Sequence, residues 1–287
     1  QAPAAEWPAD AWWKAYGDAQ LDALVDEALA GSPTLAQAQA RLRAAQARAQ
    51  QSRAALLPGL SLSAQAAENK QSYNNGIPPA FTPQGYNDTG RASLDLSFDL
   101  DLWGKNRAAL AAATSEATAA EMDAIQTRLI LTTAVVGAYA DVSRAFAQQE
   151  AAQQAQVNRE ATRQLVAQRV ANGAANQGEL RQAEAGLASA DQDLAAAKEQ
   201  LALARDQVAA LVGAGPDRGL SIGKPRQAAT RDFGLPQNLA ADLLGRRPDL
   251  QAARLRAEAA GKRIDVAHAA FYPNVNLAAF IGAQSLG

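Results

Sequence analysis

Residues able to carry out chemistry are scarce in this sequence. Its 287 residues include no cysteine, one histidine and one methionine. These counts exclude a thiol nucleophile, a cysteine-type zinc site and a multi-histidine metal cluster. The single histidine, His268, has alanine on both sides, which favours a structural role. We therefore predict no enzymatic activity, no cofactor and no metal.

The aspartates near position 100 form a regular pattern of charged side chains. Asp95, Asp99 and Asp101 fall at alternate positions, and the positions between them are apolar: Ala92, Leu94, Leu96, Phe98, Leu100 and Leu102. A period of two indicates a β-strand with one apolar and one polar face. Residues 60–67 show the same alternation, and a loop rich in Asn, Gly and Pro separates the two runs. The sequence therefore predicts a β-hairpin.

This hairpin has two interpretations. It is either a soluble hairpin whose apolar face covers a core, or a transmembrane hairpin whose apolar face contacts lipid. Both strands have about the length of a transmembrane β-strand, and Trp103 suits an aromatic girdle at the membrane surface. We therefore expect Leu94, Leu96, Phe98 and Leu100 to face lipid, and Asp95, Asp99 and Asp101 to face an aqueous lumen.

The composition favours long helices over a single globular core. About a quarter of the residues are alanine, 48% are apolar and only 5% are aromatic; alanine is the strongest helix former. A formal charge of -2 gives no basic surface for nucleic acid. The longest uncharged apolar stretch, residues 129–140, is shorter than the roughly 20 residues of a spanning helix, so no transmembrane helix is predicted.

Heptad patterns predict three helices, over residues 33–57, 105–172 and 176–212. Ser32 and Pro33 suit the start of the first. Its seam, apolar except at Ser52, follows spacings of three and four: Leu35, Ala38, Leu42, Ala45, Ala49, Ser52 and Leu56. The third helix has the clearest seam: Leu180, Ala183, Leu187, Ala190, Leu194, Ala197, Leu201, Ala204, Val208 and Leu211. Such seams are typical of helices in a coiled coil.

The long predicted helix has two seams on nearly opposite sides. The first comprises Leu110, Ala117, Ala124, Leu131, Ala138, Ala145 and Ala152. The second comprises Met122, Ile125, Leu129, Val136, Tyr139 and Phe146. A helix with two opposite apolar stripes needs a neighbour on each side. This pattern predicts a wall or barrel of helices.

The sequence also contains an internal repeat. Pro33 and Pro58 recur 215 positions later as Pro248 and Pro273, and leucine, alanine and arginine positions between them agree without a gap. The repeat unit is a helix, two strands and a helical hairpin. The second copy is expected to be incomplete, because the sequence stops at Gly287 after its first strand.

Three segments resemble signatures of a known family. They are residues 96–105 (LSFDLDLWGK), 244–250 (LGRRPDL) and 264–273 (IDVAHAAFYP). They are similar to segments of the TolC-like outer-membrane factors, in the NodT-type lipoprotein branch that serves drug-efflux pumps. The resemblance implies a homotrimeric exit duct, with a β-barrel in the outer membrane of a Gram-negative bacterium and an α-barrel in the periplasm. It also implies two partners, a periplasmic adaptor protein and an inner-membrane transporter.

The resemblance also assigns a role to the tip of the helical hairpin. Arg169, Gly173, Asn176 and Glu179 match the family's tip residues, and Asn172 lies among them. These residues are expected to dock the adaptor. From spacing alone, Gly173 is expected in the left-handed conformation that ends the long helix, with Asn176 and Glu179 forming a capping box.

Together these patterns predict a mainly α protein with transmembrane β-strands and an internal repeat. The predicted segments are an N-terminal equatorial part (1–32), a helix (33–57), a transmembrane hairpin (58–103), a periplasmic helical hairpin (104–213), an equatorial linker (214–242) and the second repeat (243–287). The predicted function is a passive outer-membrane channel of a tripartite efflux pump. The alternative is a soluble periplasmic coiled-coil scaffold, which would have no use for a lipid-facing hairpin.

Overall fold

The computed structural model describes residues 11–72, 74, 76–82, 84–226 and 245–286. The chain divides into two compact units. The first, which we call the hairpin unit, combines residues 1–39 and 123–248; the second, the sheet unit, combines residues 40–122 and 249–287. Each unit combines residues from separate parts of the chain. The six predicted segments are continuous in sequence, and their division of the chain stays a prediction.

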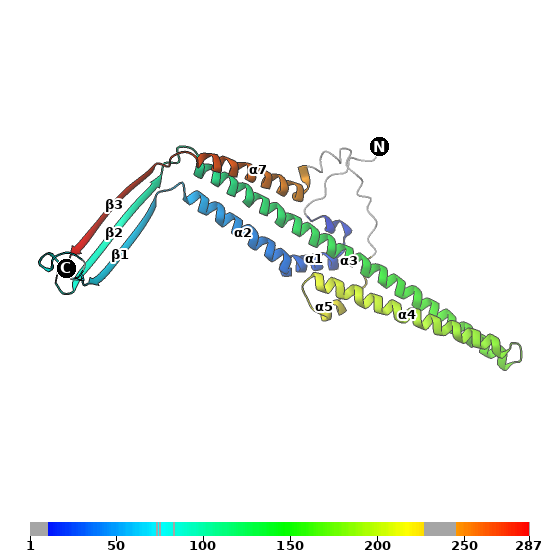
Figure 1. The fold of residues 1–287 in the computed structure, drawn as a ribbon. Coiled ribbons are helices and arrows are strands. Elements are labelled where there is room, and N and C mark those ends of the chain that lie inside the picture. Colours follow the sequence, from blue (N-terminus) through cyan, green and yellow to red (C-terminus); the bar gives the residue numbers. More distant parts are fainter. Residues whose placement is uncertain (1–10, 73, 75, 83, 227–244, 287) are drawn as a thin grey trace, which may run out of the picture. The chain divides into compact units, whose positions relative to one another are not determined.

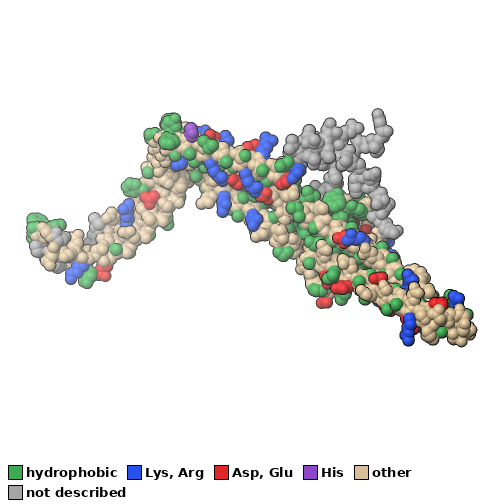
Figure 2. Space-filling view, turned by 45° about the vertical axis from the view of Figure 1, so that its right-hand side comes forward, with side chains coloured by type: hydrophobic (Ala, Val, Ile, Leu, Met, Phe, Trp, Pro, Cys, Tyr) green, Lys and Arg blue, Asp and Glu red, His purple; other side chains and the backbone are tan. Residues whose placement is uncertain are grey.

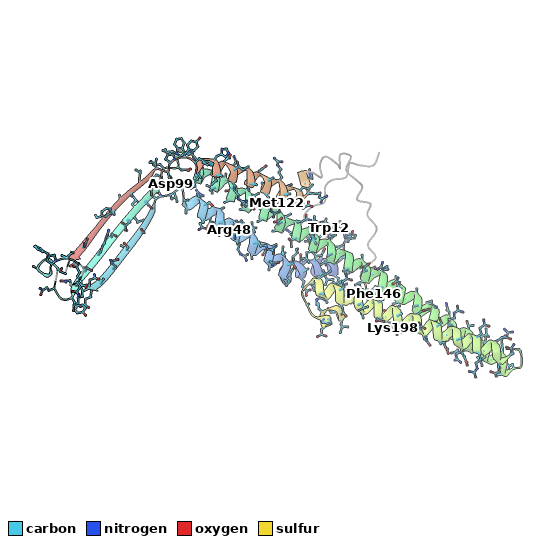
Figure 3. The ribbon with its side chains drawn as sticks, viewed as in Figure 1. Trp12, Arg48, Asp99, Met122, Phe146 and Lys198 are labelled. Atoms are coloured by element: carbon cyan, nitrogen blue, oxygen red, sulfur yellow. The ribbon has the colours of Figure 1, made fainter. Side chains whose placement is uncertain are left out.

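The hairpin unit is built on two long antiparallel helices. Helix α3 (Lys105–Ala171) runs without a break for 67 residues, and its part beyond residue 122 lies beside α4 (Gln177–Leu211) (Figure 1). Both agree closely with the predicted helices. Gln156 on α3 donates a hydrogen bond to Asp191 on α4, and the Arg205 guanidinium of α4 lies 4.9 Å from the Phe146 ring of α3 (Figure 3).

The core of this unit forms where short helices pack on α3 and α4. These are η1 (Trp12–Tyr16), α1 (Ala19–Gly31) and α5 (Pro216–Leu220). The core contains one cluster of buried side chains from four parts of the chain: Trp13, Leu21, Leu24, Val25, Ala28, Val135, Ala138, Tyr139, Val142, Ala145, Leu201, Ala204, Val208, Val212 and Ile222. The N-terminal segment therefore belongs to the same folded unit as the hairpin.

The sheet unit contains three antiparallel strands in the order β1-β2-β3 (Figure 1). They are β1 (Gly59–Asn69), β2 (Asn87–Asp99) and β3 (Asn276–Leu286); a short 3-10 helix η2 (Pro79–Phe81) lies in the loop between β1 and β2. The predicted hairpin is present. Its second strand begins five residues before Ala92 and ends at Asp99.

The internal repeat is visible in the helix bounds. Helix α2 (Pro33–Ala54) and helix α7 (Pro248–Ala269) each have 22 residues, and they begin and end 215 positions apart. α7 lies beside the first part of α3 (Figure 1), and Arg263 on α7 forms an ion pair with Glu116 on α3 at 2.9 Å. Helix packing here is close, because the buried positions of both helices are alanines: Ala112, Ala119, Ala252 and Ala259.

The predicted seams agree with the pattern of burial. In α2 and α4, every seam position is buried or half-buried. In α3 the first seam behaves in the same way, whereas Ile125 and Leu129 of the second seam are 45% and 44% exposed. The second seam is therefore exposed at Ile125 and Leu129, between the half-buried Met122 and Val136.

Helix α3 also bears on the expectation that no helix could span a membrane. By length and composition alone, α3 is one described helix apolar enough to cross a membrane. The expectation rested on the longest stretch without a charged residue, whereas part of α3 stays apolar on average when up to two charged residues are included. A single helix that passes this test is weak support for a span, because core helices pass it too.

Candidate functional site

The tip of the helical hairpin is shaped by the end of α3. Gly173 has φ 71°, the left-handed conformation predicted for it. Its N–H donates to the carbonyl of Val170 at 3.0 Å, and the N–H of Ala174 donates to the carbonyl of Arg169 at 2.8 Å. These two bonds form a Schellman motif, which satisfies the last carbonyls of the helix. The backbone of Gly173 thus turns the chain at the tip.

The start of α4 completes the turn with a capping box. The Asn176 side chain accepts a hydrogen bond from the Glu179 N–H at 3.0 Å, and the Glu179 carboxylate accepts from the Asn176 N–H at 3.4 Å and from Asn176 Nδ2 at 2.8 Å. This arrangement satisfies otherwise unpaired donors at the helix start. A Cβ at Gly178 would lie 3.0 Å from the Asn176 cap oxygen, which explains the small residue there.

The structure brings the five predicted docking residues together at this tip. Arg169, Asn172, Gly173, Asn176 and Glu179 are all exposed. Their surface is small and polar, with one cationic and one anionic side chain and exposed backbone groups around Gly173. Such a surface can bind another protein through hydrogen bonds and charge, but it offers little apolar area.

An ion pair lies on α3 about two turns before the tip. Arg163 donates two hydrogen bonds to Glu160, at 2.9 and 2.7 Å. These bonds, together with one from Gln164, lower the pKa of Glu160 to about 2. The carboxylate therefore stays ionised at any physiological pH.

The sheet divides into two chemically distinct faces. The pairing register places Leu62 and Ile281 opposite Leu94, and Leu60 and Ala279 opposite Leu96. Directly opposed residues share a face. One face therefore carries an unbroken apolar set from all three strands: Leu60, Leu62, Ala64, Ala66, Ala92, Leu94, Leu96, Phe98, Leu277, Ala279, Ile281 and Ala283.

The opposite face is mainly polar and is linked across strands. Ser63 Oγ lies 2.9 Å from Ser93 Oγ, and Ser93 donates to Asp95 at 3.0 Å. Gly282 leaves room for this ladder, since a Cβ there would lie 2.6 Å from the Ala92 carbonyl oxygen and 3.0 Å from Ser93 Cβ. Asp95 and Asp99 lie on this face, as the alternation predicted, and Phe280 is its aromatic exception.

The prediction for Asp101 was wrong. β2 ends at Asp99, so Asp101 lies beyond the strand, with φ 42°. Its carboxylate accepts hydrogen bonds from the backbone N–H groups of Asn106 (2.8 Å) and Arg107 (3.0 Å) in the first turn of α3. The first N–H groups of a helix have no partner within the helix, so they bind a nearby carboxylate. At Asp101 this interaction prevails over the alternation of the strand.

Two neighbours of Asp101 also mark the end of the sheet. Leu100 follows β2, although its N–H still donates to the Val275 carbonyl at 3.1 Å. Asp99 lies at the junction with the helices (Figure 3), where it accepts hydrogen bonds from Asp101 N–H and Asn106 Nδ2. Both residues therefore belong to the boundary of the strand rather than to its middle.

A buried polar network in the hairpin unit was not predicted from the sequence. Tyr139 on α3 donates to the Asp18 carboxylate at 2.7 Å, and the Arg226 N–H donates to the same oxygen at 3.0 Å. Gln20 donates to the Tyr139 hydroxyl and exchanges two hydrogen bonds with the backbone of Gly223. The network fastens residues 223–226 and the start of α1 to the middle of α3.

The network also shifts two pKa values. Burial alone would raise the pKa of Asp18, but the hydrogen bonds from Tyr139, Arg226 and Gln20 outweigh it and lower the pKa below its ordinary value. Burial and the neighbouring carboxylate raise the pKa of Tyr139. No local signal could reveal this network, because the hydrogen bonds from Tyr139 and Arg226 to Asp18 each join residues more than 100 positions apart.

The described residues hold no group of three or more metal-ligating side chains. His268 is exposed on α7, and it takes no part in the tip or in either face of the sheet.

Residues 24–214 and 239–287 match the protein family described as outer membrane efflux protein. The fusaric acid resistance protein FusA of Burkholderia cepacia is 40% identical over 282 residues, which cover 97% of this chain and 52% of the relative. The multidrug resistance outer membrane protein MdtP of Escherichia coli K12 is 33% identical over 287 residues, or 98% and 59% of the two chains. The chain thus spans little more than half the length of these relatives.

A solved structure shares the fold. The outer membrane protein VceC of Vibrio cholerae superposes with a TM-score of 0.85 at 43% sequence identity, and the match covers 98% of this chain and 66% of VceC. The long helices and the three-stranded sheet therefore have a close counterpart in a known protein.

Proposed function

Since this chain belongs to the outer membrane efflux protein family, we propose that it forms the exit duct of a tripartite efflux pump. The duct is a passive channel in the outer membrane that carries drugs or other small molecules out of the cell. It performs no chemistry and works by providing a water-filled path. The division of the sheet into an apolar and a polar face is the observation that carries this proposal.

The sheet dimensions support a membrane-spanning role. The strands have 11 to 13 residues, and at about 3.3 Å per residue and a tilt near 45° they span roughly 25–30 Å, close to the thickness of a bilayer core. Leu94, Leu96 and Phe98 then contact lipid, with Leu100 at the boundary, and Asp95 and Asp99 line the lumen. Closing such a barrel requires further strands, and we propose that three copies of the protein supply them.

The hairpin tip is proposed to dock the periplasmic adaptor. Arg169, Asn172, Gly173, Asn176 and Glu179 form its contact surface, which is exposed and preorganised by the two caps. The contact per copy is small, so the affinity comes from three tips acting together. The adaptor in turn connects the duct to an inner-membrane transporter.

Membrane fractionation combined with conductance measurement tests this function. We expect the protein in the outer-membrane fraction as a trimer, and discrete conductance steps when the purified trimer is added to planar bilayers. A protein that stays in the soluble periplasmic fraction and conducts no ions would overturn the proposal and favour the scaffold alternative.

A further inference from the structure

Phe280 is an aromatic side chain on the polar face of the sheet, and none of the roles described above uses it. It lies on β3, where Ala278 and Gly282 are its neighbours on the same face. Both neighbours are small, and Phe280 is 75% exposed. The ring is therefore available to a molecule that passes over this face.

The pairing register places the carboxylate of Asp95 beside this ring. Asp95 on β2 and Phe280 on β3 are directly opposed, so their Cβ atoms are about 4.5–5.5 Å apart on the same face. Asp95 Oδ2 accepts a hydrogen bond from Ser93, whose hydroxyl also contacts Ser63 on β1. These contacts hold the carboxylate, while Oδ1 has no hydrogen-bond partner among the described residues. An aromatic ring and a partly open carboxylate thus lie side by side.

The charge of Asp95 is not compensated on this face. Asp95 forms no ion pair within the described part of the chain. Arg91 is the next cation along β2 on the same face, and four residues correspond to about 13 Å along a strand. This separation exceeds the screening length of about 8 Å at physiological ionic strength. Asp99 adds a second negative charge in the other direction, so the part of the polar face toward the helices is anionic.

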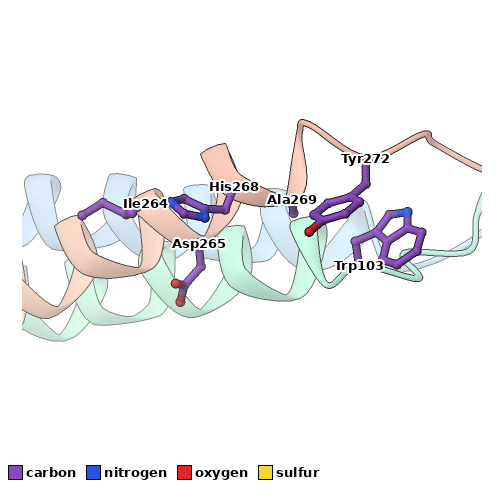
Figure 4. Close-up of a pocket in the computed structure, with 6 residues that line it drawn as sticks. All are labelled: Trp103, Ile264, Asp265, His268, Ala269 and Tyr272. Carbon is purple, nitrogen blue, oxygen red and sulfur yellow. The ribbon is translucent and has the colours of Figure 1, made fainter.

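A different aromatic group marks the end of the sheet that joins the helices. Trp103 and Tyr272 stack with ring centroids 4.7 Å apart beside a cavity of about 410 Å³ (Figure 4). Figure 2 shows hydrophobic side chains gathered beside the histidine at this end. Exposed Trp and Tyr favour the membrane surface. Asp95 lies about 13 Å farther along the strand than Asp99, so in the barrel proposed above it faces the membrane-spanning part of the lumen together with Phe280.

We propose that the Asp95–Phe280 pair binds organic cations that carry an aromatic group as they pass through the lumen. The carboxylate attracts the cationic group, and the ring of Phe280 contacts both the cation and the apolar part of the molecule. A small cation without an apolar group gains mainly the first interaction, and an organic anion is repelled by Asp95 and Asp99. This inference rests on the proposed channel function and assigns it a preferred class of substrate.

Block of the channel current by three small ions tests this site. Benzyltrimethylammonium combines a cation with a ring, tetramethylammonium carries the cation alone, and benzenesulfonate combines a ring with a negative charge. The purified trimer is placed in planar bilayers in potassium chloride. We expect benzyltrimethylammonium to halve the current at a concentration about fivefold lower than tetramethylammonium, as one exposed aromatic contact allows. Benzenesulfonate should not reduce the current.

Two substitutions separate the carboxylate from the ring. Asp95→Asn should raise the blocking concentration of both cations, because both lose the same charge. Phe280→Leu should reduce the difference between the two cations to less than about twofold, since leucine offers no ring to the cation. Phe280→Tyr keeps a ring and should keep the difference.

The matched controls change the same residue types on the opposite face of the sheet. They are Asp88→Asn and Phe98→Leu, and neither should alter the block by the two cations. Equal effects of Asp95→Asn and Asp88→Asn, or of Phe280→Leu and Phe98→Leu, would overturn the proposal. A parent protein that forms no conducting pore contradicts the channel function, whereas a pore that both cations block equally contradicts this site alone.

Cysteine labelling provides a readout that does not depend on the current. The sequence contains no cysteine, so the thiol introduced by Phe280→Cys reacts alone. A cationic methanethiosulfonate reagent should label it about fivefold faster than an anionic one of similar size, as one nearby charge allows, and Asp95→Asn should reduce this ratio. The thiol of Phe98→Cys should react with neither reagent. If the thiol at position 280 is unreactive toward both reagents in the trimer, another part of the assembly covers this position and the site is overturned.

Discussion

The hairpin unit and the sheet unit place their large apolar side chains in opposite ways. In the hairpin unit, Leu24, Val135 and Val208 are completely buried. In the sheet unit, Leu62 and Ile281 are 77% and 74% exposed, whereas Ser93 is only 4% exposed. The hairpin unit buries its large apolar side chains, whereas the sheet unit exposes them and buries Ser93.

This difference has one physical cause, the tendency of apolar surface to leave water, which acts in two different environments. Apolar surface is stabilised when it leaves water. The hairpin unit removes it by packing helices together, whereas no second layer among the described residues covers the apolar face of the three-stranded sheet. Lipid would cover that face in a barrel, and the polar face would then meet water in the lumen. The comparison therefore predicts that equal substitutions have different effects in the two units.

The largest effect is expected for Leu24→Ala in the core of the hairpin unit. Removing a completely buried leucine costs about 2–5 kcal/mol of unfolding free energy, from lost burial and the cavity left behind. Leu62→Ala on the sheet should cost less than about 1 kcal/mol, because the side chain is mostly exposed. Urea unfolding of the purified protein, followed by circular dichroism, measures both. Equal losses would remove the distinction between the units.

A charge on the apolar face of the sheet should have the next largest effect. Leu96→Arg should cost roughly 2–4 kcal/mol per copy if position 96 lies near the middle of the bilayer. Ser97→Arg changes the neighbouring position on the polar face and should be tolerated. The yield of trimer in outer membranes is the measurement. Equal damage from the two variants would argue against a lipid-facing sheet.

The tip of the hairpin unit should respond to backbone conformation. No heavy atom lies within 4 Å of a Cβ built at Gly173, so a substitution there is limited by the positive φ alone. Gly173→Val should cost about 1–2 kcal/mol locally and abolish efflux through a displaced tip. Gly173→Asn is the matched control, since asparagine tolerates this conformation.

Two further measurements decide whether the tip docks the adaptor. Trimer abundance and outer-membrane location should be the same for both Gly173 variants. Crosslinkers placed between residues 169 and 179 should capture the adaptor in the parent protein. If efflux survives Gly173→Val, or no crosslink to an adaptor forms, the tip has a capping role only.

The smallest effect is expected for Tyr139→Phe, which removes the hydrogen bond to Asp18 at a cost of about 1 kcal/mol and also the acceptor of the Gln20 side chain. The pKa of Asp18 is lowered in the folded protein, so its contribution to stability is present above its ordinary value near 4 and is lost as the pH falls through the folded value. Without the Tyr139 hydroxyl, the folded pKa lies closer to the ordinary value, so this contribution should be smaller and its loss should be complete at a higher pH. Hydrogen exchange at residues 223–226 between pH 2 and 6 measures it, and identical profiles would contradict the prediction.

Local signals account for the helices, the strands and the tip. The seam of alternating three- and four-residue spacings determines which side of α2 and α4 is covered, because a helix repeats every 3.6 residues. Gly173 and the Asn176–Glu179 pair mark the turn, because their roles depend on neighbours within five positions. The faces of the sheet follow from the alternation, and the register confirms that the three strands share them.

Contacts between distant parts of the chain could not be predicted. The Asp18, Gln20 and Tyr139 network joins elements whose approach depends on the whole hairpin unit. The carboxylate of Asp101 illustrates competition between two local rules. Its position fits the strand alternation and also a helix start, and only the path of the backbone decides which rule applies.

The repeat shows most clearly which features the local sequence determines and which depend on the tertiary structure. α2 and α7 have the same length, the same initial proline and equivalent arginines, so the sequence by itself determined that both are helices with the same bounds. The two helices are nevertheless buried on different sides. The covered positions of α2 include Leu42, Ala45 and Ala49, whose counterparts Ala257, Ala260 and Ile264 in α7 are exposed. Alanine occurs on several sides of both helices, so the apolar pattern leaves more than one side suitable for burial, and the choice depends on where the neighbouring helix lies.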